Sequence, residues 1–178
     1  VWLTIAKEGQ ASAWYGAHGN SGTLNGNAAL RFTDAATGGS TVFGAVNASG
    51  VTGNVYLEFS AENASFGTFT SNSASSVVGS YATDIKGNVD IVINSGSFSS
   101  TTSIGGATHV YVNGGSINGD VMGGGLAGSI SGGSNATVTG GVIAGSVYGA
   151  GKGGSIREGS AVRVTGGTIK GDVYAGGS

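Results

Sequence analysis

Short segments in which apolar and polar residues alternate recur along the chain, and the C-terminal third repeats them at a constant interval. The pattern occurs as VYVNGGSI from Val110, ATVTGGVI from Ala136 and VRVTGGTI from Val162, so that the copies follow one another at a 26-residue step. A second motif keeps this interval and occurs as Gly119-Asp120-Val121-Met122, Gly145-Ser146-Val147-Tyr148 and Gly171-Asp172-Val173-Tyr174. Two motifs that share one period indicate a repeat architecture.

The N-terminal half carries a fainter form of the same repeat. Apolar–polar–apolar triplets at a 27-residue step occur at Leu3-Thr4-Ile5, Leu30-Arg31-Phe32 and Leu57-Glu58-Phe59. The next good match is Ile91-Val92-Ile93, which lies at a step of 34 from Leu57 and a step of 19 from Val110; the two steps together equal one step of 27 and one of 26. An alternative strand at Thr83-Asp84-Ile85 restores even spacing but lacks the motif, and the sequence leaves both open.

These patterns predict an all-β fold, a parallel β-helix in which each repeat unit, about 26–27 residues long, forms one coil. Alternation with a period of two is typical of strands with one buried face, and the intervening glycines supply positive φ at sharp corners. The 178 residues then make roughly six to seven coils, whose equivalent side chains stack in ladders. The ladders predicted to point inward are Val110–Ala136–Val162, Val112–Val138–Val164, Ile117–Ile143–Ile169 and Val121–Val147–Val173, and the one predicted to point outward is Tyr111–Thr137–Arg163.

We expect a single β-helical repeat domain over residues 1–178. Residues 1–27 form its irregular first coil or cap, residues 28–109 its degenerate coils, and residues 110–178 its regular 26-residue repeats. The side chains of Trp2, Trp14 and Tyr15 are expected to cover the first coil, because the open end of a solenoid needs a cap. The sequence stops in the middle of a repeat, from which we expect either a piece of a longer protein or a unit that stacks end to end.

The composition suits strands and excludes several classes of protein. Glycine accounts for 38 residues, proline for none, and the glycines lack the every-third-residue period of collagen. The lack of proline fits parallel strands, in which every backbone N–H is needed for pairing. No apolar run approaches the roughly 18–20 residues of a membrane-spanning helix. Seven Lys and Arg against nine Asp and Glu give a net charge of −2, too few and too dispersed cations for binding nucleic acid.

The sequence holds no pattern that indicates a metal or a cofactor. There is no cysteine, which removes disulfides, thiolate nucleophiles and cysteine-based metal sites. His18 and His109 are isolated in sequence, whereas zinc needs three or four ligands, so we interpret both as surface or corner residues. Asp120 and Asp172 are predicted to lie two coils apart, about 9.6 Å, too far to share one calcium ion.

Catalysis is not predicted, and no catalytic residue is assigned. A glycosidase needs two carboxylates about 5–10 Å apart on either side of a sugar. The ladders bring Asp34, Glu58 and Glu62 nearest to such an arrangement. Arg31 faces Glu58 from the neighbouring coil, however, so a cross-strand ion pair is the simpler interpretation.

The candidate binding residues are Tyr148, Tyr174, Arg163 and Asp172. Met122, Tyr148 and Tyr174 form a ladder at the 26-residue step. If that ladder points outward, it makes an exposed stripe, and Arg163 and Asp172 complete a glycan-binding groove beside Tyr174. The favoured alternative is that the ladder residues stack on one another or turn inward, because aromatic ladders stabilise stacked strands without any ligand.

The repeats also resemble those of a known class of proteins. The segment GGTIKGDVY over 166–174, with its relatives over 114–122 and 140–148, resembles the glycine-rich repeats of bacterial autotransporter (type V secreted) proteins. The resemblance covers about residues 88–178 and concerns composition and repeat, not a catalytic motif. It implies an exported, surface-displayed β-helical passenger, often an adhesin. Such proteins usually end in a membrane β-barrel, and no segment of this sequence matches one. Any membrane contact is therefore expected only through a C-terminal barrel that this sequence lacks.

We therefore predict an extracellular or cell-surface structural or adhesive β-solenoid that acts through passive contacts and assembles into filaments if its coils stack across molecules. Its partners would be further copies of itself, end to end or side by side, or a host or glycan surface. The alternative is a secreted carbohydrate-binding or polysaccharide-degrading β-helix, because such proteins share the architecture.

Overall fold

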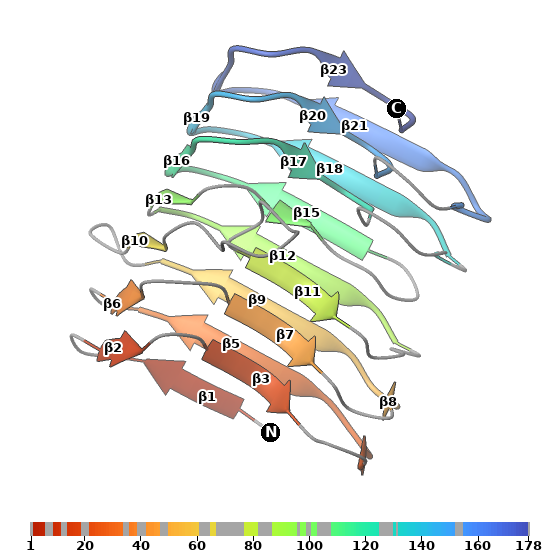
Figure 1. Cartoon of the computed structure of the whole chain (residues 1–178). Coiled ribbons are helices and arrows are strands. Elements are labelled where there is room, and N and C mark those ends of the chain that lie inside the picture. The colour runs from red at the N-terminus through yellow and green to blue at the C-terminus, as the bar shows by residue number, and fades with distance from the viewer. Residues whose placement is uncertain are drawn as a thin grey trace.

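The computed structural model is a stack of coils built from strands (Figure 1). It describes residues 2–5, 9–11, 14–18, 22–33, 36–38, 42–46, 50–60, 65–66, 77–81, 87–95, 97–98, 101–102, 108–124, 130, 132–151 and 155–177. These residues contain no helix, and therefore none long and apolar enough to cross a membrane. The colours of Figure 1 run in order along the stack, so each coil lies against its neighbours in sequence.

Three parallel sheets of seven strands each run along the stack, and the strand order in each follows the sequence. Sheet A has the longest strands: β1 (Trp2–Ile5), β5 (Ala28–Phe32), β9 (Val55–Phe59), β12 (Val89–Ile93), β15 (Thr108–Val112), β18 (Ser134–Val138) and β21 (Ser160–Val164). Sheet B comprises β2 (Gly9–Ala11), β6 (Ala36–Gly38), β10 (Ser65–Phe66), β13 (Ser97–Phe98), β16 (Ser116–Ile117), β19 (Val142–Ile143) and β22 (Thr168–Ile169).

Sheet C lies nearest the viewer in Figure 1, in front of the long strands of sheet A. It comprises β3 (Trp14–His18), β7 (Val42–Val46), β11 (Val77–Tyr81), β14 (Thr101–Thr102), β17 (Val121–Met122), β20 (Val147–Tyr148) and β23 (Val173–Tyr174). A short fourth sheet pairs β4 (Thr23–Leu24) with β8 (Gly50–Val51). The predicted all-β solenoid of stacked parallel coils is confirmed.

Strand pairing fixes the register where the sequence left two alternatives open. In β12, Ile91 pairs with Leu57 of β9 on one side and with Val110 of β15 on the other. The motif-bearing segment is therefore the strand of sheet A, and the intervals around it are 34 and 19 residues. The alternative at Thr83-Asp84-Ile85 lies outside the described residues.

The predicted ladders are confirmed as paired rows that continue into the degenerate coils. They are buried inside the stack, whereas in the last coil Val164 and Val173 are 45% and 49% exposed. One row of sheet A runs Leu30–Leu57–Ile91–Val110–Ala136–Val162, and the next runs Phe32–Phe59–Ile93–Val112–Val138–Val164. The rings of Phe32 and Phe59 stack with centroids 5.1 Å apart. The rows Ile117–Ile143–Ile169 and Val121–Val147–Val173 complete the core from sheets B and C. The predicted outward row holds as well, since Tyr111 and Thr137 are half-buried and Arg163 is exposed.

The paired glycines that follow strands β15, β18 and β21 have two separate functions. A Cβ added to the first glycine, Gly140 for example, would collide with the Asn113 carbonyl of the preceding coil. The second glycine, Gly141, has a φ of 82°, a conformation that side chains disfavour. The Gly-Gly motif is therefore needed both for close stacking of coils and for the corner itself.

Buried hydroxyls tie sheet A to sheet C within a coil. Thr108 and Ser134 begin β15 and β18 with 0% exposure, and their hydroxyls donate to the carbonyls of Gly123 and Gly149. Ser160 makes the equivalent bond to the carbonyl of Ala175 at 2.6 Å. A buried hydroxyl without a hydrogen-bond partner costs free energy of folding. These bonds give the buried hydroxyls of Thr108 and Ser134 the partners they need. This ladder of hydroxyls was not predicted from the sequence.

The described residues between 2 and 18 belong to the same stack as the later coils. β1, β2 and β3 pair in parallel with β5, β6 and β7, so the segment expected to form an irregular first coil or cap contributes a strand to each large sheet. The side chains of Trp2, Trp14 and Tyr15, for which we predicted a capping role, lie outside the described side chains.

Candidate functional site

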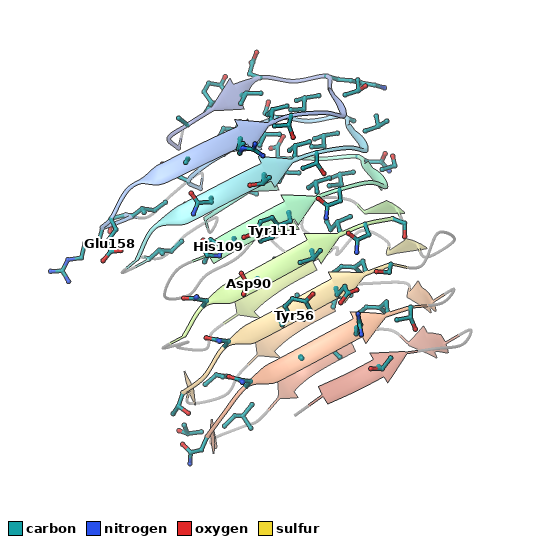
Figure 2. All side chains as sticks on the ribbon, turned by 180° about the vertical axis from the view of Figure 1, so that it is seen from behind. Tyr56, Asp90, His109, Tyr111 and Glu158 are labelled. Atoms are coloured by element: carbon teal, nitrogen blue, oxygen red, sulfur yellow. The ribbon has the colours of Figure 1, made fainter. Side chains whose placement is uncertain are left out.

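The outer surface of sheet A carries two rows of polar and aromatic side chains. In β12, β15 and β18 the first, third and fifth residues are buried, so the second and fourth face outward. Parallel pairing stacks the outward residues into rows. One row is Ala29–Tyr56–Asp90–His109–Asn135–Ala161, and the other is Arg31–Glu58–Val92–Tyr111–Thr137–Arg163. We call this surface, seen in Figure 2, the sheet-A face.

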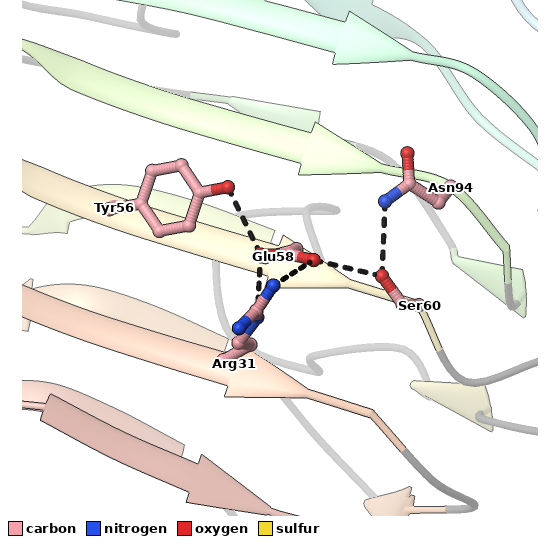
Figure 3. A network of polar contacts seen from close by, with 5 residues as sticks. All are labelled: Arg31, Tyr56, Glu58, Ser60 and Asn94. Carbon is pink, nitrogen blue, oxygen red and sulfur yellow. Dashed lines mark hydrogen bonds and ion pairs between the residues drawn. The ribbon is translucent and has the colours of Figure 1, made fainter.

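Glu58 is the centre of a hydrogen-bond network on this face (Figure 3). Arg31 donates to it from Nε at 2.8 Å and from Nη2 at 3.2 Å, which is a bidentate pair and confirms the ion pair predicted from the ladder. The hydroxyls of Tyr56 and Ser60 each donate to the carboxylate at 3.1 Å. Asn94 extends the network by donating to the Ser60 hydroxyl at 3.0 Å. Glu58 thus accepts four hydrogen bonds while only 9% exposed.

The network sets the protonation state of its members. Burial by itself would raise the pKa of Glu58, but the hydrogen bonds it accepts and the charge of Arg31 outweigh burial, so its pKa lies below the ordinary value of 4.5. The hydrogen bond to Glu58, followed by the charge of Glu58, raises the pKa of Arg31. Burial, followed by the same carboxylate, raises the pKa of Tyr56. At neutral pH the carboxylate is therefore ionised, the guanidinium is charged and the phenol is a neutral donor.

Asp90 and His109 form a second pair further along the sheet-A face (Figure 2). Asp90 Oδ1 and His109 Nδ1 lie 3.0 Å apart on paired positions of β12 and β15. The His109 ring meets the ring of Tyr111 edge-on, with centroids 6.2 Å apart and an interplanar angle of 68°. His109 is a partly exposed surface residue, as predicted, but the sequence analysis missed its partner. Aligning the motif at Ile91 with the motif at Val110 would have found it, because the preceding residues then coincide.

A depression of about 320 Å³ opens beside the Glu58 network, next to the small outward residue Ala29 of β5. Its polar lining comes from both rows and from the residues that precede the strands. The lining residues are Asn27, Ala28, Ala29, Arg31, Asn54, Tyr56, Glu58 and Asp90. The depression thus combines one aromatic ring, one guanidinium, two carboxylates and two amides on one surface.

The structure brings together three of the four residues predicted to form a glycan-binding groove, Tyr148, Tyr174 and Asp172, but not Arg163. Tyr148 is 7% exposed, so the ladder is not an exposed stripe at that position. Its ring stacks on that of Tyr174, with centroids 5.0 Å apart and an interplanar angle of 9°, which is the favoured alternative of mutual stacking. The Tyr174 hydroxyl donates to Asp172 at 3.1 Å beside sheet C, whereas Arg163 belongs to the sheet-A face. Sequence spacing could not show that these residues belong to different sides of a coil.

Elsewhere, acidic and hydroxyl side chains accept hydrogen bonds from the backbone of the next coil. The carboxylate of Asp120 accepts the N–H of Ser146 at 2.8 Å, and the hydroxyl of Ser146 accepts the N–H of Asp172 at 3.0 Å. Within the described part of the chain, no group of three or more His, Asp and Glu residues is placed to hold a metal ion. The side chain of His18 and the carboxylates of Asp34 and Glu62 lie outside that part.

Comparisons with known proteins found no relative of this chain. No family model matches it, and neither the curated proteins nor the solved structures gave a match.

Proposed function

We propose that the chain is an exported β-solenoid of the bacterial cell surface, of the kind found in autotransporter passengers, and that it acts as a stalk, adhesin or filament subunit. In this proposal the stack comprises six to seven coils, which the seven strands of each sheet support. The glycine-rich repeats support the proposed family. The role is passive: a stiff core holds surface side chains in fixed rows, and these rows contact other surfaces.

The observation that carries this proposal is the continuity of the core and of the surface ladders along the stack. Core rows of sheet A pass without interruption from β5 to β21. The polar side chains on the sheet-A face pair along the same direction, Arg31 with Glu58 and Asp90 with His109. A stack in which each coil buries the face of the next is suited to a rod, and its fixed rows are suited to contact.

The state of Glu58 supports a role without catalysis. A glycosidase needs a carboxylic acid whose pKa is raised, so that it can donate a proton to the leaving group. The pKa of Glu58 is shifted the opposite way, and its four hydrogen bonds occupy the carboxylate. Glu58 is therefore not suited to be the general acid of a polysaccharide-degrading enzyme, whereas the depression beside Tyr56 favours carbohydrate binding.

Surface labelling tests this proposal directly. An antibody raised against the purified chain should label intact cells of the source bacterium, and protease added to intact cells should remove the labelled protein. A cytoplasmic protein of the same cells serves as the control for integrity. Labelling that requires permeabilised cells would contradict the proposal.

Electron microscopy of the purified chain over a concentration series tests self-assembly. End-to-end stacking predicts filaments of uniform width that Val173→Lys abolishes, because Val173 is 49% exposed on the last strand of sheet C. Lateral association predicts instead that Val142→Lys is the disruptive change, since Val142 is 40% exposed on the side of the stack. Filaments that persist in both variants would exclude both surfaces, and short single rods of the unchanged chain would exclude self-assembly.

A further inference from the structure

We infer that the depression beside Tyr56 on the sheet-A face binds a neutral saccharide. The inference gives the adhesive part of the proposed function a ligand and rests on that function for its biological meaning. The volume of about 320 Å³ lies at the lower end of the range for small-molecule sites, about 300–1,000 Å³. A site of this size suits a sugar unit at the surface of a longer glycan rather than an extended chain.

Tyr56 supplies the apolar surface for such a ligand. Its ring is half-buried next to Ala29, the residue paired with it in β5, whose small side chain leaves the depression open. Tyrosine has an apolar ring and a polar tip, and here Glu58 holds the tip at 3.1 Å. The C–H-bearing face of a pyranose ring is the apolar side of a polyhydroxyl ligand and packs well on an aromatic ring. Because the ring is already held, its binding costs little side-chain entropy.

Two side chains with fixed orientations supply hydrogen-bond donors at the same place. Arg31 directs Nε and Nη2 at Glu58 and keeps its remaining guanidinium N–H groups on a side chain that is 46% exposed. Asn54 accepts the backbone N–H of Asn88 with Oδ1 at 2.9 Å, which leaves its amide N–H₂ as a donor. Both groups are thus oriented by bonds within the protein before a ligand arrives.

Asp90 supplies the acceptor, and the charges around the depression favour an uncharged ligand. Oδ1 of Asp90 pairs with His109, and among the described residues Oδ2 of Asp90 has no hydrogen-bond partner. An anion would approach Arg31 but would also meet the carboxylates of Glu58 and Asp90, and a cation would meet the guanidinium. A hydroxyl group both donates and accepts, so vicinal hydroxyls of a sugar use the donors and the acceptor together.

Saturation-transfer difference NMR on the purified full chain tests the inference. The probes are the methyl glycosides of glucose, galactose, mannose and N-acetylglucosamine, with methyl glucuronide as the charged comparison. We expect transfer from the protein to at least one neutral glycoside at about 10 mM, because a shallow site gives affinities near the millimolar range. Backbone amide shifts in β5 and β9 should move with the same ligand.

Variants then assign the binding to Tyr56. Tyr56→Ala should weaken binding by about tenfold or more, whereas Tyr56→Phe keeps the ring and should retain binding within about threefold. The matched control is Tyr111→Ala, which removes a half-buried tyrosine of the same face that does not line the depression; it should leave binding unchanged. The amide shifts of the unchanged chain give the assignment even if one variant fails to fold.

Three results would overturn the inference. They are no transfer to any neutral glycoside at about 10 mM, amide shifts confined to strands away from β5 and β9, and transfer to the glucuronide alone, which would make the depression an anion site. The binding experiment uses the purified chain and does not depend on where the protein lies in the cell. It can therefore fail while surface labelling of cells succeeds, and it can succeed while surface labelling fails. Failure of the saccharide site and failure of the proposed function are therefore distinguishable.

Discussion

The regular repeats over residues 110–178 and the degenerate coils over residues 28–109 share one core but carry different surfaces. In the regular repeats a constant interval of 26 residues stacks like on like in the core, for example Val121 on Val147. Their sheet-A face stacks Tyr111 on Thr137 and Thr137 on Arg163, with no ion pair among the described residues. In the degenerate coils the intervals are 27, 34 and 19 residues. Unlike residues then meet: Arg31 pairs with Glu58, and Asp90 pairs with His109 at the border of the two regions.

The comparison shows that the strands decide the register and that the corners absorb differences in length. Ile91 keeps its row between Leu57 and Val110 although the intervals on its two sides differ. A one-residue shift would turn the whole apolar set of a strand outward, whereas doubling the length of a loop costs only about 0.6 kcal/mol. Differences in corner length therefore leave both the inward and the outward rows of sheet A in register.

The largest expected effect is a loss of stability from core substitutions, which tests whether the cores of the two regions are packed equally tightly. Ile91→Ala in the degenerate region and Ile143→Ala in the regular region each remove a side chain that is 0% exposed. Each should lower the free energy of unfolding by about 2–5 kcal/mol, measured by urea denaturation. The control, Val142→Ala, alters a side chain that is 40% exposed and should stay within about 0.5 kcal/mol of the unchanged chain. A much smaller loss for Ile91→Ala would show that the degenerate coils are not packed as tightly.

A smaller difference is expected between two glycine corners. Gly141 and Gly26 both have positive φ, 82° and 128° respectively. A Cβ added at Gly141 would collide with the backbone of Gly114, whereas a Cβ added at Gly26 would have no atom within 4 Å. Gly26→Ala should cost only backbone strain, about 1–2 kcal/mol. Gly141→Ala adds a collision between coils and should cost about 3 kcal/mol in total. Equal losses in thermal or urea unfolding would mean that close stacking does not constrain the regular corners.

The smallest effect concerns pH and belongs to the degenerate region alone. Glu58→Gln removes the charge that accepts four hydrogen bonds and should lower the free energy of unfolding at pH 7 by about 1–3 kcal/mol. Because the folded pKa of Glu58 lies below 4.5, this contribution is fully present above pH 4.5 and is lost as the pH falls through the folded pKa. The unchanged chain and the variant should therefore converge in stability at low pH.

Urea unfolding at a series of pH values between 7 and 3 measures this convergence. The control is Ser146→Ala in the regular region. The Ser146 hydroxyl accepts a backbone N–H and does not titrate. The difference in free energy of unfolding between this variant and the unchanged chain should therefore not change as Glu58 is protonated. A difference between the Glu58→Gln variant and the unchanged chain that stays constant down to pH 3 would contradict the lowered pKa.

Much of the fold could be predicted from the sequence because its signals are local and repeated. Alternation with a period of two marks each strand, and a constant interval places equivalent residues in one ladder once the coils stack in parallel. The rows through Val110, Ile117 and Val121 were predictable for this reason. The Arg31–Glu58 pair was also predictable, because both residues occupy the middle of matching triplets 27 residues apart.

The remaining features depend on how the sides of a coil face one another, which no single interval encodes. Tyr148 and Arg163 each lie in a predicted ladder. Only the path of the chain around a coil decides that Tyr148 is buried in its ring stack and that Arg163 lies on the sheet-A face. Asp90 meets His109 because strand pairing compensates for two unequal corners. The depression beside Tyr56 exists because Ala29 is small where the next coils carry Tyr56 and Asp90 in the same row. Alternation and interval are properties of the chain, whereas the side of the coil and the packing between unlike neighbours arise only when the coils close and stack.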